Sequence, residues 1–563
     1  MSTTPLQEDL SRVSKRTKKP GPVYLIFALA FLFCVGLYFF YPAFEQGTLN
    51  PTSEIHIYYM GQKVEETAFY EDELYLPFTF VKEYLDPHIQ WDENTKQVII
   101  TTTKEVLHLP VGTTEGLYNL EPYSFTYPVL EKEGKIYLPA EPLNKYYFLD
   151  VKYFAEEQVV AVHDLKQPIQ EGIILNPTKL RLKPHTVSPW LVQLNKDQKV
   201  SIMREEKGWY WVETSDGLMG YVDERKVELG QIRLAEIDKE EYLPWNPLGE
   251  KILLTWEGAW GTTPDPNKIG DITGVQVLSP TWFSLQENGL VNNTADLAYV
   301  KWAHATGRQV WGLFDNSFDP DLTHVFLNDA SLRAKVIKQI LTYVDLYNLD
   351  GINLDFENMY LKDKDAYVQF VRELAPLLRE KDRVISLDVT FISQSENWSL
   401  VYDRQKLGEV VDYMMVMAYD EHGTFSSRAG SVSSLPWVEK GIQAILEQVP
   451  NKKIILGVPL YTRLWEESYD ENGKLVVKSQ ALSMERAQKW LKENKVQIQE
   501  DQATGQNYAE LKKDGVVYKM WLEDELSLSR RVELMKKYRL AGIATWMRSY
   551  ATDEVWPVLA DCL

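Results

Sequence analysis

The sequence has few cysteines, and it carries them where they cannot build a scaffold. Only two occur among 563 residues, Cys34 inside an apolar run and Cys562 beside the C-terminus. No disulfide framework is therefore available, and cysteine usage says nothing about the redox compartment. The eight histidines are scattered without His-Glu-x-x-His spacing, and Cys-x-x-Cys is absent. These absences predict no metal and no organic cofactor.

Positive charge is also scarce, because 60 Lys and Arg face 81 Asp and Glu for a formal net charge of −21. A protein that neutralises phosphates needs concentrated Lys and Arg, so nucleic acid is excluded as a partner. Phosphate-cradling Gly-rich loops and a Gly-x-Ser-x-Gly elbow are missing as well. Aromatic residues make up 12% of the chain, which suits packed cores and stacking platforms for a neutral glycan.

One long apolar run is present near the N-terminus. Residues 23–41 carry no charge and reach about 28 Å as a helix, the thickness of a bilayer core. Basic residues within 12–19 place the preceding tail, 1–22, in the cytoplasm by the positive-inside rule. The alternative is a cleaved signal peptide, but the run is long and lacks a clear Ala-x-Ala site. We expect a single-pass signal anchor in the cell membrane, with the rest of the chain extracellular.

Two small modules are predicted between this run and the C-terminal half. Residues 54–165 contain a weak repeat that reads strand, short helix, hairpin, and they resemble the N-terminal domain of copper amine oxidases. We expect an α+β stalk that acts as a spacer and binds no copper. Residues 172–229 alternate in short strands and are similar to bacterial SH3-like domains, which often bind wall peptides. Trp209 and Trp211 are candidate binding residues there, or simply core aromatics.

From residue 248 to 563, short apolar runs alternate with helical-period segments, which is typical of repeated β–α units. Eight such units close a TIM (β/α)8 barrel of the α/β class. A strand-rich insertion over 463–525 is expected between strands seven and eight. The eight predicted strands cover 252–256, 274–278, 309–313, 351–355, 384–388, 413–417, 453–457 and 542–546.

The fourth predicted strand carries an unusual polar face. Ile352, Leu354 and Phe356 alternate with three polar side chains, which are Asn353, Asp355 and Glu357. An edge strand with a solvated face would show the same alternation. The flanking β–α pattern instead buries both faces, and burying unpaired carboxylates without a function costs several kcal/mol, roughly, per ion. The pattern therefore favours a functional site.

The two carboxyl groups of this strand can influence each other's ionisation. Residues two apart on a strand lie about 6.6 Å apart at the Cα, so Asp355 and Glu357 each resist loss of the other's proton. Glu357 is the last of the polar residues, and active sites of these barrels lie at the carboxyl ends of the strands. We expect Glu357 to stay protonated near neutral pH and to act as a general acid.

These residues resemble glycoside hydrolase family 18 from about residue 251 to 556. The family motif Asp-x-x-Asp-x-Asp-x-Glu matches Asp350, Asp355 and Glu357, while Asn353 replaces the second acid, as in the branch of spore-cortex-lytic N-acetylglucosaminidases. The Met-x-Tyr-Asp signature and the tryptophan beneath the reacting sugar are matched further along the chain. Those matches are Met417, Tyr419, Asp420 and Trp546.

The resemblance implies substrate-assisted catalysis with retention of configuration, in which the 2-acetamido oxygen of the sugar attacks the anomeric carbon. It implies that Glu357 protonates the leaving oxygen and then activates water, that Asp355 holds the acetamido N–H, and that Tyr419 orients the acetamido oxygen. Asn353 would donate a hydrogen bond that keeps Asp355 ionised. Asp350 completes the predicted catalytic set, while Asp420, Met417 and Trp546 are predicted to contact substrate.

Three further tryptophans lie at or near predicted strand ends, and they are candidates for stacking on sugar faces or for core packing. They are Trp256, Trp282 and Trp311. His422 is interpreted as a loop residue rather than a catalytic one. The predicted function is a membrane-anchored β-N-acetylglucosaminidase of peptidoglycan. A chitinase and a non-catalytic glycan-binding scaffold remain the alternatives.

Overall fold

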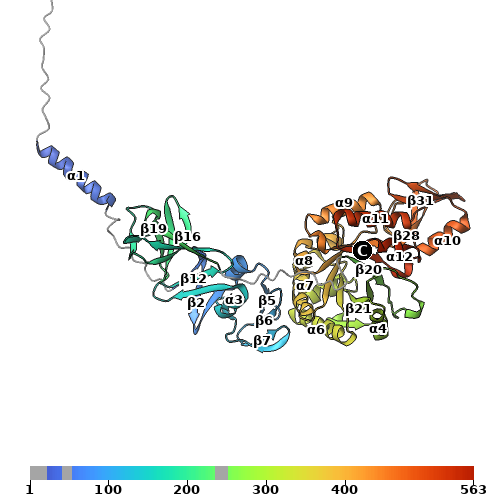
Figure 1. Ribbon diagram of the computed structural model, residues 1–563, viewed down its shortest axis with the longest axis horizontal. Coiled ribbons are helices and arrows are strands. Elements are labelled where there is room, and N and C mark those ends of the chain that lie inside the picture. Colours follow the sequence, from blue (N-terminus) through green and yellow to red (C-terminus); the bar gives the residue numbers. More distant parts are fainter. Residues whose placement is uncertain (1–21, 41–53, 235–250) are drawn as a thin grey trace, which may run out of the picture. The chain divides into compact units, whose positions relative to one another are not determined.

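The structure is a computed structural model that describes residues 22–40, 54–234 and 251–563 (Figure 1). The chain divides into two compact units. The first comprises Met1–Phe80 with Leu138–Asp238, and the second comprises Val81–Tyr137 with Lys239–Leu563. The second unit therefore contains the C-terminal barrel together with a segment that interrupts the stalk module in sequence.

The N-terminal apolar run forms helix α1 (Pro22–Phe40). Among the described residues, however, no helix is long and apolar enough to cross a membrane, so the transmembrane helix predicted over 23–41 is not found there. Most of the predicted tail, 1–21, lies outside the described residues.

The stalk part of the first unit is a sheet whose strands run in the order β11–β12–β1–β2–β3. β1 pairs with β12 in parallel, and the other neighbours are antiparallel. Helix α3 (Ala140–Tyr147) precedes β11. The strand bounds are Ile55–Tyr59 for β1, Gln62–Glu71 for β2, Glu73–Pro77 for β3, Leu149–Phe154 for β11 and Val159–Asp164 for β12.

The part predicted to be SH3-like is a second sheet in the order β15–β14–β18–β17–β16–β13–β19, with a small apolar core that includes Leu194 and Val212. Trp211 donates its indole N–H to the Gly61 carbonyl at 2.7 Å and so ties this sheet to the stalk sheet. The strands are β13 (Ile169–Ile174), β14 (Thr178–Arg181), β15 (Trp190–Leu194), β16 (Lys199–Glu206), β17 (Trp209–Thr214), β18 (Met219–Asp223) and β19 (Val227–Arg233).

A five-stranded antiparallel meander belongs to the second unit. Its residues Ile99, Val106 and Leu120 are fully buried in the same apolar core as the outer layer of the barrel. The turn α2 (Phe78–Phe80) and the π-helical η2 (Val81–Leu85) precede it, and the hairpin of β9 (Leu130–Lys132) and β10 (Lys135–Pro139) follows. The meander strands are β4 (Gln90–Asp92), β5 (Gln97–Thr101), β6 (Val106–Pro110), β7 (Glu115–Tyr118) and β8 (Glu121–Ser124).

The predicted barrel is confirmed. Eight strands pair in parallel, and a pairing between β20 and β21 closes the ring (Figure 1). Most of these strands are apolar along much of their length because both of their faces are buried, whereas β24 and β25 carry polar residues as well. The barrel strands are β20 (Ile252–Glu257), β21 (Val277–Gln286), β23 (Gln309–Asp315), β24 (Gly351–Asp355), β25 (Val384–Thr390), β26 (Tyr413–Met417), β27 (Ile454–Pro459) and β33 (Gly542–Trp546).

The second strand begins later than predicted, because Gly274 has a φ of +82° and belongs to the turn that precedes β21. The antiparallel β22 (Leu290–Asn293) then extends this edge. The helices around the barrel are α4 (Leu297–Ala305), α5 (Pro320–Leu327), α6 (Ala330–Tyr347), α7 (Lys364–Arg379), α8 (Arg404–Val410), α9 (Leu435–Leu446), α11 (Glu525–Tyr538) and α12 (Val555–Ala560).

A separate sheet stands between the seventh and eighth barrel strands, in the order β29–β28–β32–β31–β30, with helix α10 (Met484–Asn494) packed on it. Its first strand begins at Tyr461, directly after β27. The strand bounds are β28 (Tyr461–Tyr469), β29 (Leu475–Ser483), β30 (Ile498–Asp501), β31 (Gln506–Lys513) and β32 (Val516–Trp521).

Candidate active site

Acidic side chains gather where the barrel strands end. Asp315 ends β23 and is the register partner of Asp355 at the end of β24, while Asp388 lies near the end of β25 and Glu257 ends β20. The carboxyl ends of parallel strands meet at one rim of a barrel. The fold therefore brings these carboxyl groups to the same rim from four different strands.

The alternation along β24 places apolar and polar residues on different sides of the barrel wall. Ile352, Leu354 and Phe356 are fully buried in the layer between strands and helices. Asn353 and Asp355 lie on the opposite face of the strand, toward the interior, and both are buried. Thus β24 presents its polar residues to the inside of the ring and not to the outer helices.

Asp355 is a buried carboxyl group surrounded by other acids. Burial raises its pKa well above the ordinary value, and the neighbouring Glu357 and Asp388 raise it further. Among the described residues, its Oδ1 atom accepts no hydrogen bond. A buried acceptor without a partner is costly unless a ligand donates to it, so this oxygen is suited to receive an N–H from a bound molecule.

Glu357 follows β24 at the rim. Burial, followed by the negative charge of Asp420, raises the pKa of Glu357 to about 7. Burial likewise raises the pKa of the neighbouring Asp315 to about 6. At neutral pH a large fraction of Glu357 therefore still carries its proton, as a general acid requires.

A residue that sequence reasoning missed holds the backbone of Glu357. Asn316, fully buried just after β23, accepts a hydrogen bond from the Glu357 N–H at 3.0 Å through Oδ1 and donates from Nδ2 to the Glu357 carbonyl at 2.7 Å. Its Nδ2 also donates to Thr323 Oγ1 at 2.9 Å. This side chain thus fixes the peptide groups on both sides of the Glu357 Cα, which makes Asn316 a positioning residue.

Replacing Asn316 tests this clamp. We expect Asn316→Ala to lower kcat by about 10- to 100-fold, because small displacements of a catalytic group are enough to cost that much. The basic limb of the pH dependence of kcat/KM should also shift, since Glu357 loses its fixed environment. Thr323→Val, which removes only the outer partner, serves as the control and should retain most activity. Equal activity of Asn316→Ala and the native chain in a steady-state assay would contradict the assignment.

The predicted hydrogen bond from the Asn353 amide to Asp355 is wrong. Its amide Nδ2 donates to Asp388 Oδ1 at 2.8 Å and not to Asp355, and its Oδ1 accepts from the Trp256 indole at 2.8 Å. Asp388 is buried, and burial raises its pKa well above the ordinary value while the Asn353 hydrogen bond opposes the shift. Asn353 therefore links two interior residues and leaves one Asp355 oxygen without a donor.

The residues matched after the sixth strand lie beside the acids. The pKa of Tyr419 is raised well above its ordinary value by burial and then by Asp388 and Asp355, so its hydroxyl stays protonated near these carboxyls. Asp420 adopts a φ of +60° and accepts a hydrogen bond from the Tyr461 hydroxyl at 2.7 Å. The Tyr461 ring lies edge-on to that of Tyr419, with centroids 6.3 Å apart.

Met417 and Trp546 end the sixth and eighth strands. Met417 is buried, whereas Trp546 is only partly buried and packs on the interior cluster together with Tyr419. Trp546 also stands edge-on to Trp256, at 5.8 Å between centroids. Part of the Trp546 ring therefore remains available at the rim, where a sugar could rest on it.

The predicted catalytic role of Asp350 is wrong. Asp350 precedes β24, at the opposite end of the strand from Glu357. Its Oδ2 accepts from the Val310 N–H at 2.8 Å and lies 2.8 Å from His304 Nε2. These contacts join the start of β24 to β23 and α4. Asp350 therefore stabilises the end of the barrel opposite Glu357 and lies away from the acids of the carboxyl rim. His422 lies in a loop, where its Nδ1 is 2.9 Å from the Ser431 carbonyl oxygen.

The three candidate tryptophans are core residues and do not stack on sugar. Trp256, Trp282 and Trp311 are each only 1% exposed. Trp282 donates to Thr263 Oγ1 and Trp311 to Gln309 Oε1, so both indoles are satisfied within the core. Exposed aromatic rings occur instead in segments that follow the carboxyl ends of strands β20, β23, β25 and β26. These rings are Trp260, Phe318, Trp398 and Phe425.

Two neighbouring acids at the carboxyl rim of an α/β barrel, one of them protonated near neutral pH, are the groups that glycosidases use. Residues 321–551 match the model for glycosyl hydrolases family 18, and residues 60–162 match the copper amine oxidase N-terminal domain. The barrel is therefore a family 18 glycoside hydrolase domain, and the stalk resemblance is confirmed. In the described residues, no group of three or more His, Cys, Asp or Glu is arranged to hold a metal ion.

A glycosylase and cortex-lytic enzymes of Bacillus species are among the similar proteins. An uncharacterised glycosylase of Bacillus subtilis (strain 168) is 24% identical over 299 residues, which cover 51% of this chain and 84% of that protein. The cortical fragment-lytic enzyme of the same organism is 27% identical over 256 residues, 45% of this chain and 58% of that enzyme. The crystal structure of the Bacillus megaterium QM B1551 spore cortex-lytic enzyme, at 20% identity and a TM-score of 0.50, covers 60% of this chain and 78% of that chain and shares the fold.

Proposed function

We propose that the barrel is a retaining β-N-acetylglucosaminidase that acts on peptidoglycan with the 2-acetamido group of the substrate as nucleophile. The observation that carries this proposal is the juxtaposition of two acids. Glu357 holds its proton near neutral pH, and the buried Asp355 beside it has an oxygen that accepts no hydrogen bond from the described residues. A proton donor next to an acceptor for an amide N–H suits a 2-acetamido sugar.

The proposed mechanism assigns one task to each side chain. Glu357 donates its proton to the glycosidic oxygen as the acetamido oxygen forms a bond to the anomeric carbon and the leaving group departs. Asp355 accepts the acetamido N–H through the oxygen that has no other donor in the described part of the chain, and so orients the acetamido group. Glu357, now ionised, takes a proton from water, which attacks the same carbon and restores the acetamido group. The Tyr419 hydroxyl donates to the acetamido oxygen and holds it in line.

Two features support a wall glycan as substrate. Cortical fragment-lytic and spore cortex-lytic enzymes are among the proteins that this chain resembles. The exposed rings of Trp260, Phe318 and Trp398 follow strand ends at the rim, where sugar faces can stack. Reducing-end release from peptidoglycan and from chitin oligomers separates the alternatives. Faster turnover of chitin would favour a chitinase, and binding without products from either would favour a scaffold.

The pH dependence follows from the raised pKa of Glu357. Since the protonated form is required, activity is retained below the folded-state pKa and lost as pH rises through it. We expect the basic limb of kcat/KM at an apparent pKa of about 7, with a tenfold loss per pH unit beyond it. Asp420→Asn removes a negative charge that raises this pKa, so its basic limb should move to lower pH. A native limb near 4–5, or an unmoved limb in the variant, would count against Glu357 as the acid.

We also propose that the enzyme acts outside the cytoplasm, where its proposed substrate lies, that the apolar segment 23–41 serves as its membrane anchor, and that the SH3-like part contacts wall peptides. The uncharged run and the basic residues before it support this placement. Protease digestion of intact and of permeabilised cells tests the location. Cleavage of the barrel only after permeabilisation would contradict it.

A further inference from the structure

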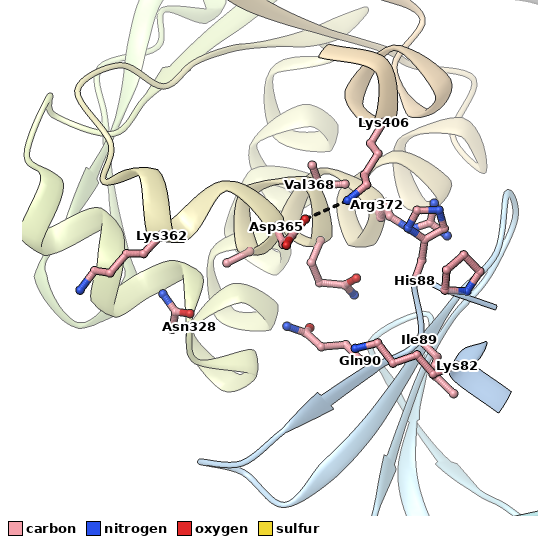
Figure 2. A pocket seen from close by; sticks show the side chains of 13 residues that line it. Lys82, His88, Ile89, Gln90, Asn328, Lys362, Asp365, Val368, Arg372 and Lys406 are labelled. Carbon is pink, nitrogen blue, oxygen red and sulfur yellow. Dashed lines mark hydrogen bonds and ion pairs between the residues drawn. The ribbon is translucent and has the colours of Figure 1, made fainter. Parts of the chain in front are cut away.

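A cavity of about 360 Å³ lies in the second unit, between helix α7 and the segment 82–90 that leads into the meander (Figure 2). Four of its lining residues are cationic and one is anionic. The charged lining residues are Lys82, Lys362, Asp365, Arg372 and Lys406. In a chain with a net charge of −21, this local excess of positive charge is unusual and attracts anions.

The polar groups of the cavity come from both walls. Figure 2 shows Lys406 reaching toward Asp365, to which it is paired at 2.9 Å, while Lys82 and Gln90 extend from the opposite wall. His88 lies near these cations. Burial and then the charge of Arg372 lower the pKa of its imidazole. The imidazole is therefore neutral at pH 7. Among the lining residues four cations face one carboxylate, while the carboxylates of Asp86 and Glu409 also act on His88 from outside the lining.

Buried contacts hold the two walls in place. The Arg333 guanidinium is fully buried and donates to Glu373 at 3.0 Å and to Gln90 Oε1 at 2.9 Å. Arg372 donates from Nε to Thr101 Oγ1 of the meander at 3.1 Å. The cavity is thus formed before any ligand arrives, which reduces the entropic cost of binding.

The cavity also lies close along the chain to the proposed acid. Lys362 follows Glu357 by five residues, and five residues span at most about 18 Å even when fully extended. Helix α7 starts two residues later, so the positive end of its dipole lies at the same side. At least this lining residue of the cavity, Lys362, therefore lies within about 18 Å of Glu357.

We propose that this cavity binds carboxylate groups carried by the glycan and thereby selects an anionic polymer over a neutral N-acetylglucosamine polymer. The inference rests on the proposed function, since it specifies the substrate class of that site. Lysine and arginine side chains supply the charge, and the amide of Gln90 supplies a neutral donor. A carboxylate there also replaces solvent around Lys406, which pairs with the carboxyl groups of Asp365 and Asp403.

A charge-removal variant tests the proposal. In the full chain, Lys82→Gln with Lys406→Gln removes one cation from each wall, and Lys301→Gln, an exposed lysine of α4, is the matched control. Two oligomers of equal length are compared, one with free carboxyl groups and one with the same groups amidated. We expect the double variant to raise KM for the carboxylated oligomer about five- to tenfold with kcat unchanged, and to leave the amidated oligomer unaffected.

Salt and binding measurements complete the test. In 1 M NaCl the native chain should lose most of its preference for the carboxylated oligomer, because these charges are partly exposed. An equal change in KM for both oligomers, or the same behaviour as Lys301→Gln, would overturn the proposal. If no glycan is cleaved at all, the proposed function fails, but calorimetry with the carboxylated oligomer still decides the cavity. Tighter binding to the native chain than to the double variant supports it, and equal binding refutes it.

Discussion

Glu357→Gln should lower kcat by about 10³-fold, while binding of the glycan stays close to that of the native chain. Gln has nearly the same shape but holds no acidic proton, so both the leaving-group step and the water step lose their catalyst. The Asn316 clamp acts on the backbone of residue 357, and it therefore remains intact in the variant. Reducing-end release gives the rate, and calorimetry gives the affinity.

The strand itself supplies the matched control for this experiment. Asp350→Asn changes a carboxyl group of the same motif, but at the far end of β24, where it contacts Val310 and His304. We expect that variant to keep kcat within a fewfold of the native value, with a modest loss of stability. If Asp350→Asn were as inactive as Glu357→Gln, the position of the site at the carboxyl rim would be contradicted.

The largest expected effect on stability concerns Arg333. Its guanidinium and the Glu373 carboxylate are both fully buried and are joined by contacts of 3.0 to 3.1 Å. Arg333 also donates to the Leu327 carbonyl at 2.7 Å. Arg333→Met would leave Glu373 as an uncompensated buried charge, so we expect the free energy of unfolding to fall by about 3–5 kcal/mol. Urea denaturation followed by circular dichroism measures it.

A double variant separates the contribution of the ion pair to the free energy of unfolding from the destabilisation caused by leaving one buried charge unpaired. Arg333→Met combined with Glu373→Met removes both charges and fills the space with apolar atoms. We expect it to recover most of the stability lost in the single variant, because a well-packed apolar pair is often as stable as a buried ion pair. A double variant at least as unstable as Arg333→Met would show that the other contacts of the pair dominate, contrary to this account.

The barrel could be predicted because its strands are buried on both faces and separated by amphipathic helices, a pattern that the sequence displays directly. The polar face of β24 could be predicted for a related reason. A period of two places Asn353 and Asp355 on one side regardless of what surrounds the strand. The identity of their neighbours could not be read in this way, since those neighbours belong to other strands.

Several wrong predictions concern how deeply a side chain is buried or how neighbouring strands are staggered. Asn353 lies opposite Ser386, so its amide reaches Asp388 two residues further along β25, and only the stagger between strands decides this. Asn316 looks like any polar residue after a strand until the turn folds its side chain against Glu357. Trp256 and Trp311 lie on strands, as their sequence pattern predicts, but the sequence does not reveal that their rings fill the interior.

The central claim is that Glu357 acts twice on a sugar whose own acetamido group forms the intermediate. The most direct test is proton NMR of the first product released from an N-acetylglucosamine-containing oligomer, before mutarotation mixes the anomers. Two displacements at the anomeric carbon predict that the β anomer appears first. An α anomer as the first product would mean a single displacement by water and would contradict the account.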